Sequence, residues 1–181
     1  MDKKQLRREI KSAIMALSDE QKSEQSARVV EAVEAIVRER QPRVLALFWP
    51  LADEVDVRAL FGLKGCRIVL PRIVNDADDI AQMEFFEYSA SDLARGAYGI
   101  MEPQSEEAYR AGEIDMMVVP GVAFTAAGER MGRGKGYYDR YLSRESFRAY
   151  CVGVCFTCQM REELSTEPHD KRVEKVVVGK R

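Results

Sequence analysis

Apolar residues recur at helical spacing at the start of the chain, at Leu6, Ile10, Ala13, Ile14 and Leu17. Side chains three and four residues apart lie on one face of a helix, so this pattern predicts an amphipathic helix. Basic side chains occupy much of the remaining surface of this helix: Lys3, Lys4, Arg7, Arg8 and Lys11.

A second helix is expected directly after the first. Ser18 and Gln21 have the spacing of a capping box, in which each side chain bonds to the backbone N–H of the other residue. This spacing predicts a helix that begins near residue 19, and an apolar stripe of valines continues to Val37. Pro42 is expected to end the helix, because the residue before a proline disfavours the helical conformation.

The rest of the chain alternates short apolar runs with helix-like segments. The mixed run over 82–88 is typical of an edge strand, and segments 56–62 and 137–146 have helical character. Buried strands that alternate with helices predict one α/β domain over residues 1–181, with three layers (α/β/α) around a mostly parallel, Rossmann-like sheet. The predicted buried strands are 43–50, 66–71, 115–120, 150–156 and 174–179.

Ligands of such sheets bind where the parallel strands end at their carboxyl side. Prolines at positions 50, 71 and 120 each close an apolar run, and we interpret them as three of these strand ends. No internal repeat or shift in composition divides the chain. We therefore looked for chemistry in the loops that follow the predicted strands.

Charge and composition narrow the range of partners. The 181 residues carry a formal net charge of −2, with a sequence pI of about 5.7. This balance argues against a nucleic acid or an acidic membrane as the main partner, because either would favour a basic surface. No apolar run is long enough to span a bilayer. Charges also interrupt the first seventeen residues, where a secretion signal would be apolar, so a cytoplasmic protein is expected.

Two of the four cysteines, Cys155 and Cys158, have the C-x-x-C spacing that redox and zinc sites use. A structural zinc site needs four ligands, and the chain has no second such pair and only one histidine, His169. Core thiols are the favoured interpretation of the cysteines. A redox pair and a metal site are the alternatives.

The segment RMGRGKGYYDRYL, residues 130–142, alternates glycines with cations and then turns to helix-forming residues. Glycines let a ligand approach the backbone, and successive free N–H groups can bind an anion. Arg133 and Lys135 would add full charges, and a helix that begins at Tyr137 would add the positive end of its dipole. The segment therefore predicts a polyphosphate site, with Asp139 placed to hold a magnesium ion.

The spacing of these glycines matches no standard phosphate-binding motif. A dinucleotide-binding fingerprint needs G-x-G-x-x-G, and a Walker A loop needs serine or threonine after the lysine, where this chain has Gly136. A solvated loop whose cations serve solubility is the alternative interpretation.

The longer segment PGVAFTAAGERMGRGKGYYDRYL, residues 120–142, resembles the signature of the 5-formyltetrahydrofolate cyclo-ligase family. KKQLRREIK at the start, FWPLADEVDV at 48–57, GAYGIMEP at 96–103 and PHD at 168–170 are similar to family segments in the same order. The resemblance implies a cytosolic enzyme that uses ATP and Mg²⁺. Its reaction would convert 5-formyltetrahydrofolate to 5,10-methenyltetrahydrofolate, with release of ADP and phosphate. Family members commonly have aspartate where this chain has Thr125.

The resemblance also implies a role for each matching residue. The implied ATP contacts are Lys3, Lys4, Arg7, Arg130, Gly132, Arg133, Gly134, Lys135, Gly136, Tyr137 and Tyr138. The implied folate contacts are Arg7, Trp49, Glu54, Arg133, Gly134, Lys135, Gly136 and Tyr137. Asp139 and Asp170 are the implied magnesium-associated acids.

Such a reaction needs aligned substrates and cations rather than a nucleophilic side chain. Lys135, together with Mg²⁺, is the candidate that stabilises the transferred charge, and Arg133 is a candidate phosphate clamp. Tyr137 is the third catalytic candidate. Trp49 offers an aromatic face to the pterin, and Glu54 offers a carboxylate to its N–H groups. Without the resemblance, Trp49 would be interpreted as a core residue, and Glu54 as a solvated turn residue or the start of a helix.

Three other functions stay open on the sequence: another ATP-using enzyme such as a small-molecule kinase, a catalytically impaired folate- or nucleotide-binding regulator, and a thiol redox protein. The expected partners are ATP and 5-formyltetrahydrofolate, with or without a polyglutamate tail. Neither nucleic acid nor membrane is expected as a partner, and a monomer is expected.

Overall fold

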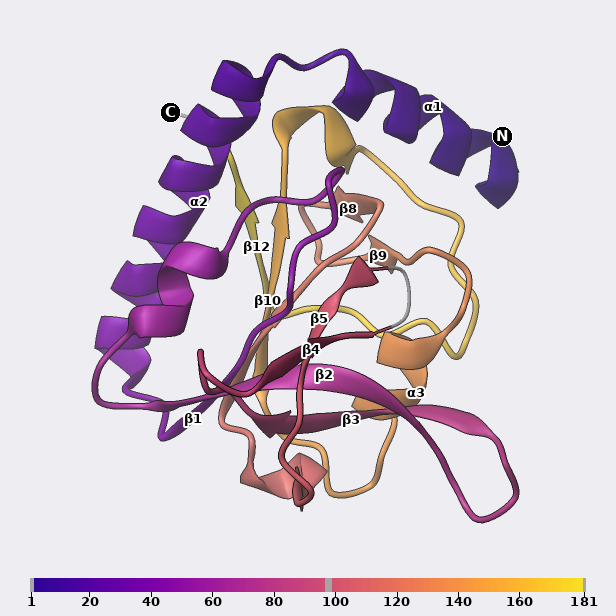
Figure 1. Ribbon diagram of the computed structural model, residues 1–181. Helices are drawn as coiled ribbons and strands as arrows, with labels where there is room; N and C mark the ends of the chain where they lie inside the picture. Colours follow the sequence, from indigo (N-terminus) through magenta and orange to yellow (C-terminus); the bar gives the residue numbers. More distant parts are fainter. Residues whose placement is uncertain (1, 97–98, 181) are drawn as a thin grey trace.

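A seven-stranded sheet runs through the computed structural model, which describes residues 2–96 and 99–180 (Figure 1). Its strands are β1 (Val44–Ala46), β2 (Arg67–Asn75), β3 (Ala81–Glu87), β6 (Ala108–Tyr109), β7 (Met116–Val119), β10 (Tyr150–Cys155) and β12 (Lys175–Val178). The strand order is β12-β10-β7-β1-β2-β3-β6. The first five strands in this order are parallel to one another, and β3 and β6 are antiparallel to their neighbours. The prediction of a mostly parallel sheet is confirmed.

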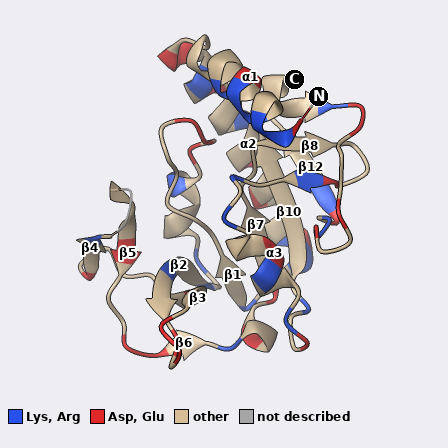
Figure 2. Ribbon diagram, turned by 90° about the vertical axis from the view of Figure 1, so that its right-hand side faces the viewer, with Lys and Arg blue, Asp and Glu red and all other residues tan. Residues whose placement is uncertain are grey.

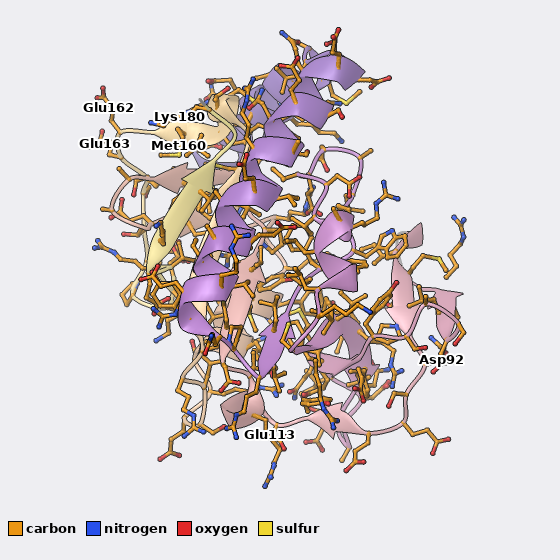
Figure 3. All side chains as sticks on the ribbon, turned by 90° about the vertical axis from the view of Figure 1, so that its left-hand side faces the viewer. Asp92, Glu113, Met160, Glu162, Glu163 and Lys180 are labelled. Atoms are coloured by element: carbon orange, nitrogen blue, oxygen red, sulfur yellow. The ribbon has the colours of Figure 1, made fainter. Side chains whose placement is uncertain are left out.

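Successive residues of the central strands point to opposite faces of the sheet, and each face has its own core. Leu45 and Val118 pack in the core beneath α1 (Lys3–Met15), α2 (Asp19–Arg40) and the 3₁₀ helix η1 (Arg58–Gly62). Figure 3 looks onto α2 from outside, with the strands of the sheet behind it. Ala46 and Val119 face the other core, which α3 (Tyr137–Leu142) and irregular segments cover. The second helical layer is therefore much thinner than the first.

The two N-terminal helices form where the sequence predicts them. Ser18 and Gln21 make both hydrogen bonds of the predicted capping box at the start of α2. Helix α2 ends at Gln41, whose φ of 48° is left-handed, directly before Pro42. Asp2 caps α1 by accepting a hydrogen bond from the backbone N of Gln5 at 2.7 Å. The helix predicted over 56–62 is η1, and the one predicted over 137–146 is the shorter α3.

The interpretation of Pro71 as a strand end is wrong, because β2 continues through it to Asn75. The residues of β2 whose backbone groups form hydrogen bonds toward β1 are Arg67 and Val69. The last residue of β2 that pairs with β1 is Val69, opposite Ala46. Pro71 lies two residues after Val69, so its backbone nitrogen points to the same side of β2. At that position β1 has already ended. The missing donor therefore falls where the pairing of β1 with β2 stops.

Several short strands have no counterpart in the predicted elements. A three-stranded sheet, in the order β11-β8-β9, and the two-stranded hairpin β4-β5 lie outside the large sheet. Residues 97–98 of the segment GAYGIMEP lie outside the described residues. The bounds of these strands are β4 Leu93–Arg95, β5 Met101–Pro103, β8 Ala123–Thr125, β9 Arg130–Met131 and β11 Met160–Arg161.

All four cysteines are free thiols. Burial raises the pKa of Cys151 and of Cys155 to about 12, and it also raises the pKa of Cys66 and Cys158. Redox-active cysteines instead have lowered pKa values. These environments support the interpretation as core thiols. Within residues 2–96 and 99–180, no helix is both long enough and apolar enough to cross a membrane.

Candidate functional site

The glycine loop, residues 132–136, connects β9 to α3 and has a backbone that requires glycine at two positions. Gly134 has a φ of +102° and Gly136 a φ of +72°, values that other L-residues rarely adopt. Gly136 is the N-cap of α3, whose first turn begins with the two tyrosines. The side chain of Lys135 is exposed, while its carbonyl accepts a hydrogen bond from Arg140 Nη1 at 2.9 Å. The loop thus presents a cation on a fixed backbone.

Arg133 joins the glycine loop to the segment that follows β1. Its Nη2 donates to Asp53 Oδ1 at 2.7 Å, and its Nη1 donates to Asp53 Oδ2 at 3.2 Å. Its Nε and Nη2 donate to Glu54 Oε1 at 3.2 Å and 3.0 Å. Two segments about eighty residues apart in the sequence are therefore held together by one guanidinium.

The pKa values of the two carboxylates beside Arg133 are shifted in opposite directions. Burial raises the pKa of Glu54, and this effect outweighs the Leu51 N–H and Arg133, which lower it. Burial is also the largest single effect on Asp53, but the hydrogen bonds and the charge of Arg133, together with a backbone N–H and the charge of Lys11, outweigh it, so the pKa of Asp53 is lowered. The Glu54 side chain is 9% exposed, and its Oε2 accepts from the backbone N of Leu51 at 2.9 Å. Glu54 is therefore fixed in place and poorly solvated.

Helix α1 brings two of its predicted site residues to the same region. It contacts η4 (Thr157–Gln159), which follows β10, so it lies across the carboxyl end of the sheet. Arg7 Nε donates to the carbonyl of Gly132 at 2.9 Å, and Lys3 Nζ lies 3.1 Å from Asp170 Oδ2. Lys4 is exposed and makes no hydrogen bond or ion pair within the described ranges. Figure 2 shows the basic positions of α1 in blue at the top of the molecule.

Arg130 lies beneath the glycine loop rather than on it. Its side chain is 3% exposed and forms an ion pair with Asp139 at 3.1 Å. Its Nη1 donates to the carbonyl of Pro120 at the end of β7, and its Nε has no partner within the described residues. The predicted ATP contact of Arg130 stays a prediction. Its observed contacts connect β7, β9 and α3.

The two acids predicted to associate with magnesium lie on neighbouring segments. Asp139 Oδ1 accepts from Arg130 and from the backbone N of Lys171, both at 3.1 Å. Asp170 precedes Lys171, and its Oδ2 accepts from Lys3 and from the backbone N of Glu167. The second oxygen of each acid accepts no hydrogen bond within residues 2–96 and 99–180. Carboxylate oxygens suit Mg²⁺, so this donor set fits the ion.

Burial alone would raise the pKa of Asp170. The N–H of Glu167 and the ammonium of Lys3 act against burial, and the pKa is lowered overall. Oxygen and nitrogen atoms of Glu167, His169 and Asp170 lie within 4.8 Å of one another. His169 is mostly exposed and shares these acids with Lys3.

Aromatic rings cluster around Trp49, five residues before Glu54 in the sequence. Trp49 is half-buried, and its ring centroid lies 5.8 Å from that of Phe61, which lies 5.0 Å from that of Tyr88. On α3, Tyr138 is half-buried beside Arg130, and burial raises its pKa. The guanidinium carbon of Arg140 lies 5.2 Å from the centre of the Tyr137 ring. Of these rings, that of Tyr138 lies near enough to Glu54 for the charge of Glu54 to contribute to its raised pKa.

Two hollows lie near these residues, and they differ in charge. One cavity of about 100 Å³ is lined by Arg7, Lys11, Ile14, Asp53, Gly121, Val122, Arg133 and Gln159. Another of about 750 Å³ lies between α2 and residues 50–59, and five of its lining residues are acidic against two that are basic. Phosphate is unfavourable in the larger, acidic hollow. The smaller one holds only a few waters, so a nucleotide needs the open surface above it.

Sequence reasoning missed three residues at this site. Asp53 stands in the acidic run with Glu54, but nothing in the run indicates a link to Arg133. Gln159 is 2% exposed, and its Nε2 donates to the carbonyls of Gly121 and Val122 at 2.8 Å and 3.0 Å. Lys11 was expected only as part of a basic helix surface. Pairings this far apart in the sequence leave no local signal.

Thr125 is the last residue of β8 and begins the turn that leads to β9. Its hydroxyl accepts from the backbone N of Glu129 and donates to Glu129 Oε2, both at 3.2 Å. Threonine thus makes the local side-chain contacts at the start of this turn.

A parallel sheet that carries a cationic glycine loop beside carboxylates and aromatic rings is typical of α/β proteins that bind phosphorylated ligands. The sequence profile of the 5-formyltetrahydrofolate cyclo-ligase family matches residues 1–179, so the chain belongs to this family.

Relatives and solved structures agree with this assignment. The chain is 28% identical over 190 residues to the 5-formyltetrahydrofolate cyclo-ligase of Mus musculus, covering 97% of this chain and 92% of the relative. It is 33% identical over 145 residues to that of Mycolicibacterium smegmatis, covering 77% and 75%. The NMR structure of Aquifex aeolicus 5,10-methenyltetrahydrofolate synthetase is 33% identical, with a TM-score of 0.87 over 100% of this chain and 91% of that one. The family resemblance and the α/β fold class are confirmed.

Proposed function

We propose that this protein catalyses the ATP-dependent conversion of 5-formyltetrahydrofolate to 5,10-methenyltetrahydrofolate, with release of ADP and phosphate. Membership of the cyclo-ligase family supports this activity. The observation that carries it is the contact of Arg133 with Glu54, because it joins a loop suited to phosphate to a carboxylate suited to the pterin. One cluster of residues can thus align both substrates.

The reaction requires that the two substrates be aligned and that the charge on the transferred phosphoryl group be stabilised. The formyl oxygen takes the γ-phosphoryl group of ATP, which turns a poor leaving group into phosphate. The neighbouring folate nitrogen then attacks the formyl carbon and loses its proton, and phosphate departs as the new C–N bond forms. Lys135 supplies a mobile positive charge for the transferred group, and the backbone at Gly134 and Gly136 lets phosphate approach closely. Arg7 and Arg133 add cations beside the loop.

The folate side is built from Glu54 and its aromatic neighbours. The carboxylate of Glu54 accepts hydrogen bonds from the amino group and ring N–H of the pterin, and Trp49 provides a stacking face. Tyr137 and Tyr138 border the same space from α3. Lys3 orders the segment 167–170 near the phosphates through its contacts with Asp170 and Glu167.

Asp139 and Asp170 are the acids that would hold Mg²⁺, which neutralises charge on the ATP phosphates when bound. We also assign the protein to the cytoplasm, as a monomer that accepts folates with or without a polyglutamate tail. Four thiols with raised pKa values give no support to a redox function.

The test is to mix the protein with 5-formyltetrahydrofolate, ATP and Mg²⁺ and to follow near-ultraviolet absorption, because the cyclised product has a conjugated amidinium. Product should form only in the complete mixture, with one ADP released per product. Release of ADP without cyclisation would indicate a kinase, and binding of both substrates without product would indicate a regulator. Either result contradicts the proposal. Activity that survives alkylation of the thiols excludes a thiol mechanism.

A further inference from the structure

Arg133 presents two different edges to the two carboxylates that hold it. The end edge, formed by Nη1 and Nη2, binds both oxygens of Asp53 at 3.2 Å and 2.7 Å. The side edge, formed by Nε and Nη2, binds only Oε1 of Glu54, at 3.2 Å and 3.0 Å. A planar guanidinium can hold a partner on each edge at once. The two contacts can therefore be exchanged separately.

The two carboxylates differ in what else they can bind. Glu54 is the group that the proposed function assigns to the pterin, and its buried side chain is also held by Leu51. The side chain of Asp53 is 16% exposed, and the only hydrogen bonds it accepts within the described residues come from Arg133. When the pterin takes Glu54, the side edge of Arg133 is released, and the end edge remains on Asp53.

The released edge lies beside the phosphate-binding side of the site. Arg133 belongs to the glycine loop and lines the small cavity together with Arg7 and Lys11. A phosphate group offers two oxygens to a side edge in the same way as a carboxylate. An arginine that lost both acids would instead have to be immobilised from many rotamers when phosphate binds, which costs free energy.

We propose that Asp53 is a positioning residue: it keeps the end edge of Arg133 in place while the side edge passes from Glu54 to a phosphate of ATP. This inference rests on the proposed function, because it needs a pterin at Glu54 and a phosphate at the glycine loop. Asp53 contacts neither substrate and acts only through Arg133.

The experiment is a double-mutant cycle on kcat/KM for ATP at saturating folate, with the variants Asp53→Asn, Arg133→Met and both together. Asp53→Asn alone should lower kcat/KM by about 10–100-fold, the range for a charge-assisted hydrogen bond. It should have almost no further effect in the Arg133→Met background, because the group it positions is gone. Asp53→Glu should recover part of the loss, because it keeps the charge.

The control is Asp56→Asn, three residues away in the same segment. Both carboxylate oxygens of Asp56 also accept hydrogen bonds from one arginine, Arg58, but neither residue contacts the glycine loop within the described residues. Asp56→Asn should leave kcat/KM for ATP within about threefold of the original protein. Melting temperatures of all variants show whether each one is folded.

Three outcomes overturn the inference. A lower KM for ATP in Asp53→Asn would mean that Asp53 competes with ATP for Arg133. Unchanged kinetics would mean that Asp53 positions nothing. Equal effects of Asp53→Asn with and without Arg133 would mean that Asp53 acts independently. If the original protein makes no cyclised product, the proposed function fails, and the same cycle measured on binding of magnesium with a non-hydrolysable ATP analogue, in the presence of 5-formyltetrahydrofolate, still tests Asp53.

Discussion

Replacing Gly136 by alanine tests whether the left-handed backbone of the glycine loop serves phosphate binding. Gly136 has a φ of +72° and is the N-cap of α3. A Cβ added there would lie 2.8 Å from Nη1 of Arg140, the atom that donates to the carbonyl of Lys135. The substitution therefore strains the backbone and displaces a flexible side chain.

The cost follows from three contributions. A left-handed conformation costs an L-residue about 1–2 kcal/mol. The stiffer unfolded chain returns about 0.4–1 kcal/mol, and loss of the exposed hydrogen bond from Arg140 adds up to about 1 kcal/mol. The net loss of unfolding free energy is about 1–2 kcal/mol, which for a chain of this size lowers Tm by about 2–8 °C.

The assay pairs thermal unfolding with kcat/KM for ATP. Gly136→Ala should lower kcat/KM more than tenfold at a temperature where the variant is fully folded. Gly62→Ala is the matched control, because a Cβ there meets nothing within 4 Å. Gly136→Asn should fall between them in stability, since asparagine tolerates this conformation. A lowered Tm with normal kcat/KM would refute the link to phosphate, and an unchanged Tm would refute the backbone geometry.

Four further results are expected. Lys135→Ala should keep its fold and lose about 10–150-fold in kcat/KM for ATP, the equivalent of a charge-assisted contact of about 1.5–3 kcal/mol; near-normal kinetics would remove Lys135 from the site. Asp139→Asn leaves the buried Arg130 without a counter-charge, so Tm should fall. The Mg²⁺ concentration for half-maximal rate should rise, because a proposed metal ligand loses its charge; an unchanged Mg²⁺ dependence would limit the role of Asp139 to its ion pair with Arg130. Because the ionised form of Glu54 accepts from the pterin and burial raises its pKa, KM for folate should rise as pH falls through that raised pKa, and Glu54→Gln should flatten this limb. Folate should quench the fluorescence of Trp49, the only tryptophan, saturably and more than magnesium-ATP does; flat emission, corrected for absorption, would place the pterin elsewhere.

Local sequence signals predicted the elements whose causes are local. The capping box at Ser18 and Gln21 and the apolar stripe of α2 need only neighbouring residues, and both form as expected. Pro71 misled because its effect depends on where β1 ends, which is a tertiary fact. Strands of two or three residues, such as β9, are defined by their pairing partners and carry no period of their own.

The same division applies to the candidate site. The glycines of the loop were identified because unusual backbone geometry depends on residue type at that position. Arg130 stands beside the same glycines, and only the fold shows that it is buried against Asp139. Asp53 gave no signal because its partner lies 80 positions away.

The contacts of α1 also bear on the order in which the site can form during synthesis. Lys3 meets Asp170 across 167 positions and Arg7 meets Gly132 across 125, so α1 can make these contacts only after the chain between them has been synthesised. Until η4 has left the ribosome, α1 lacks an element that it packs against. A nascent chain therefore exposes part of a basic amphipathic helix until these later segments are made. Chaperones that bind such helices would meet this protein before either substrate can.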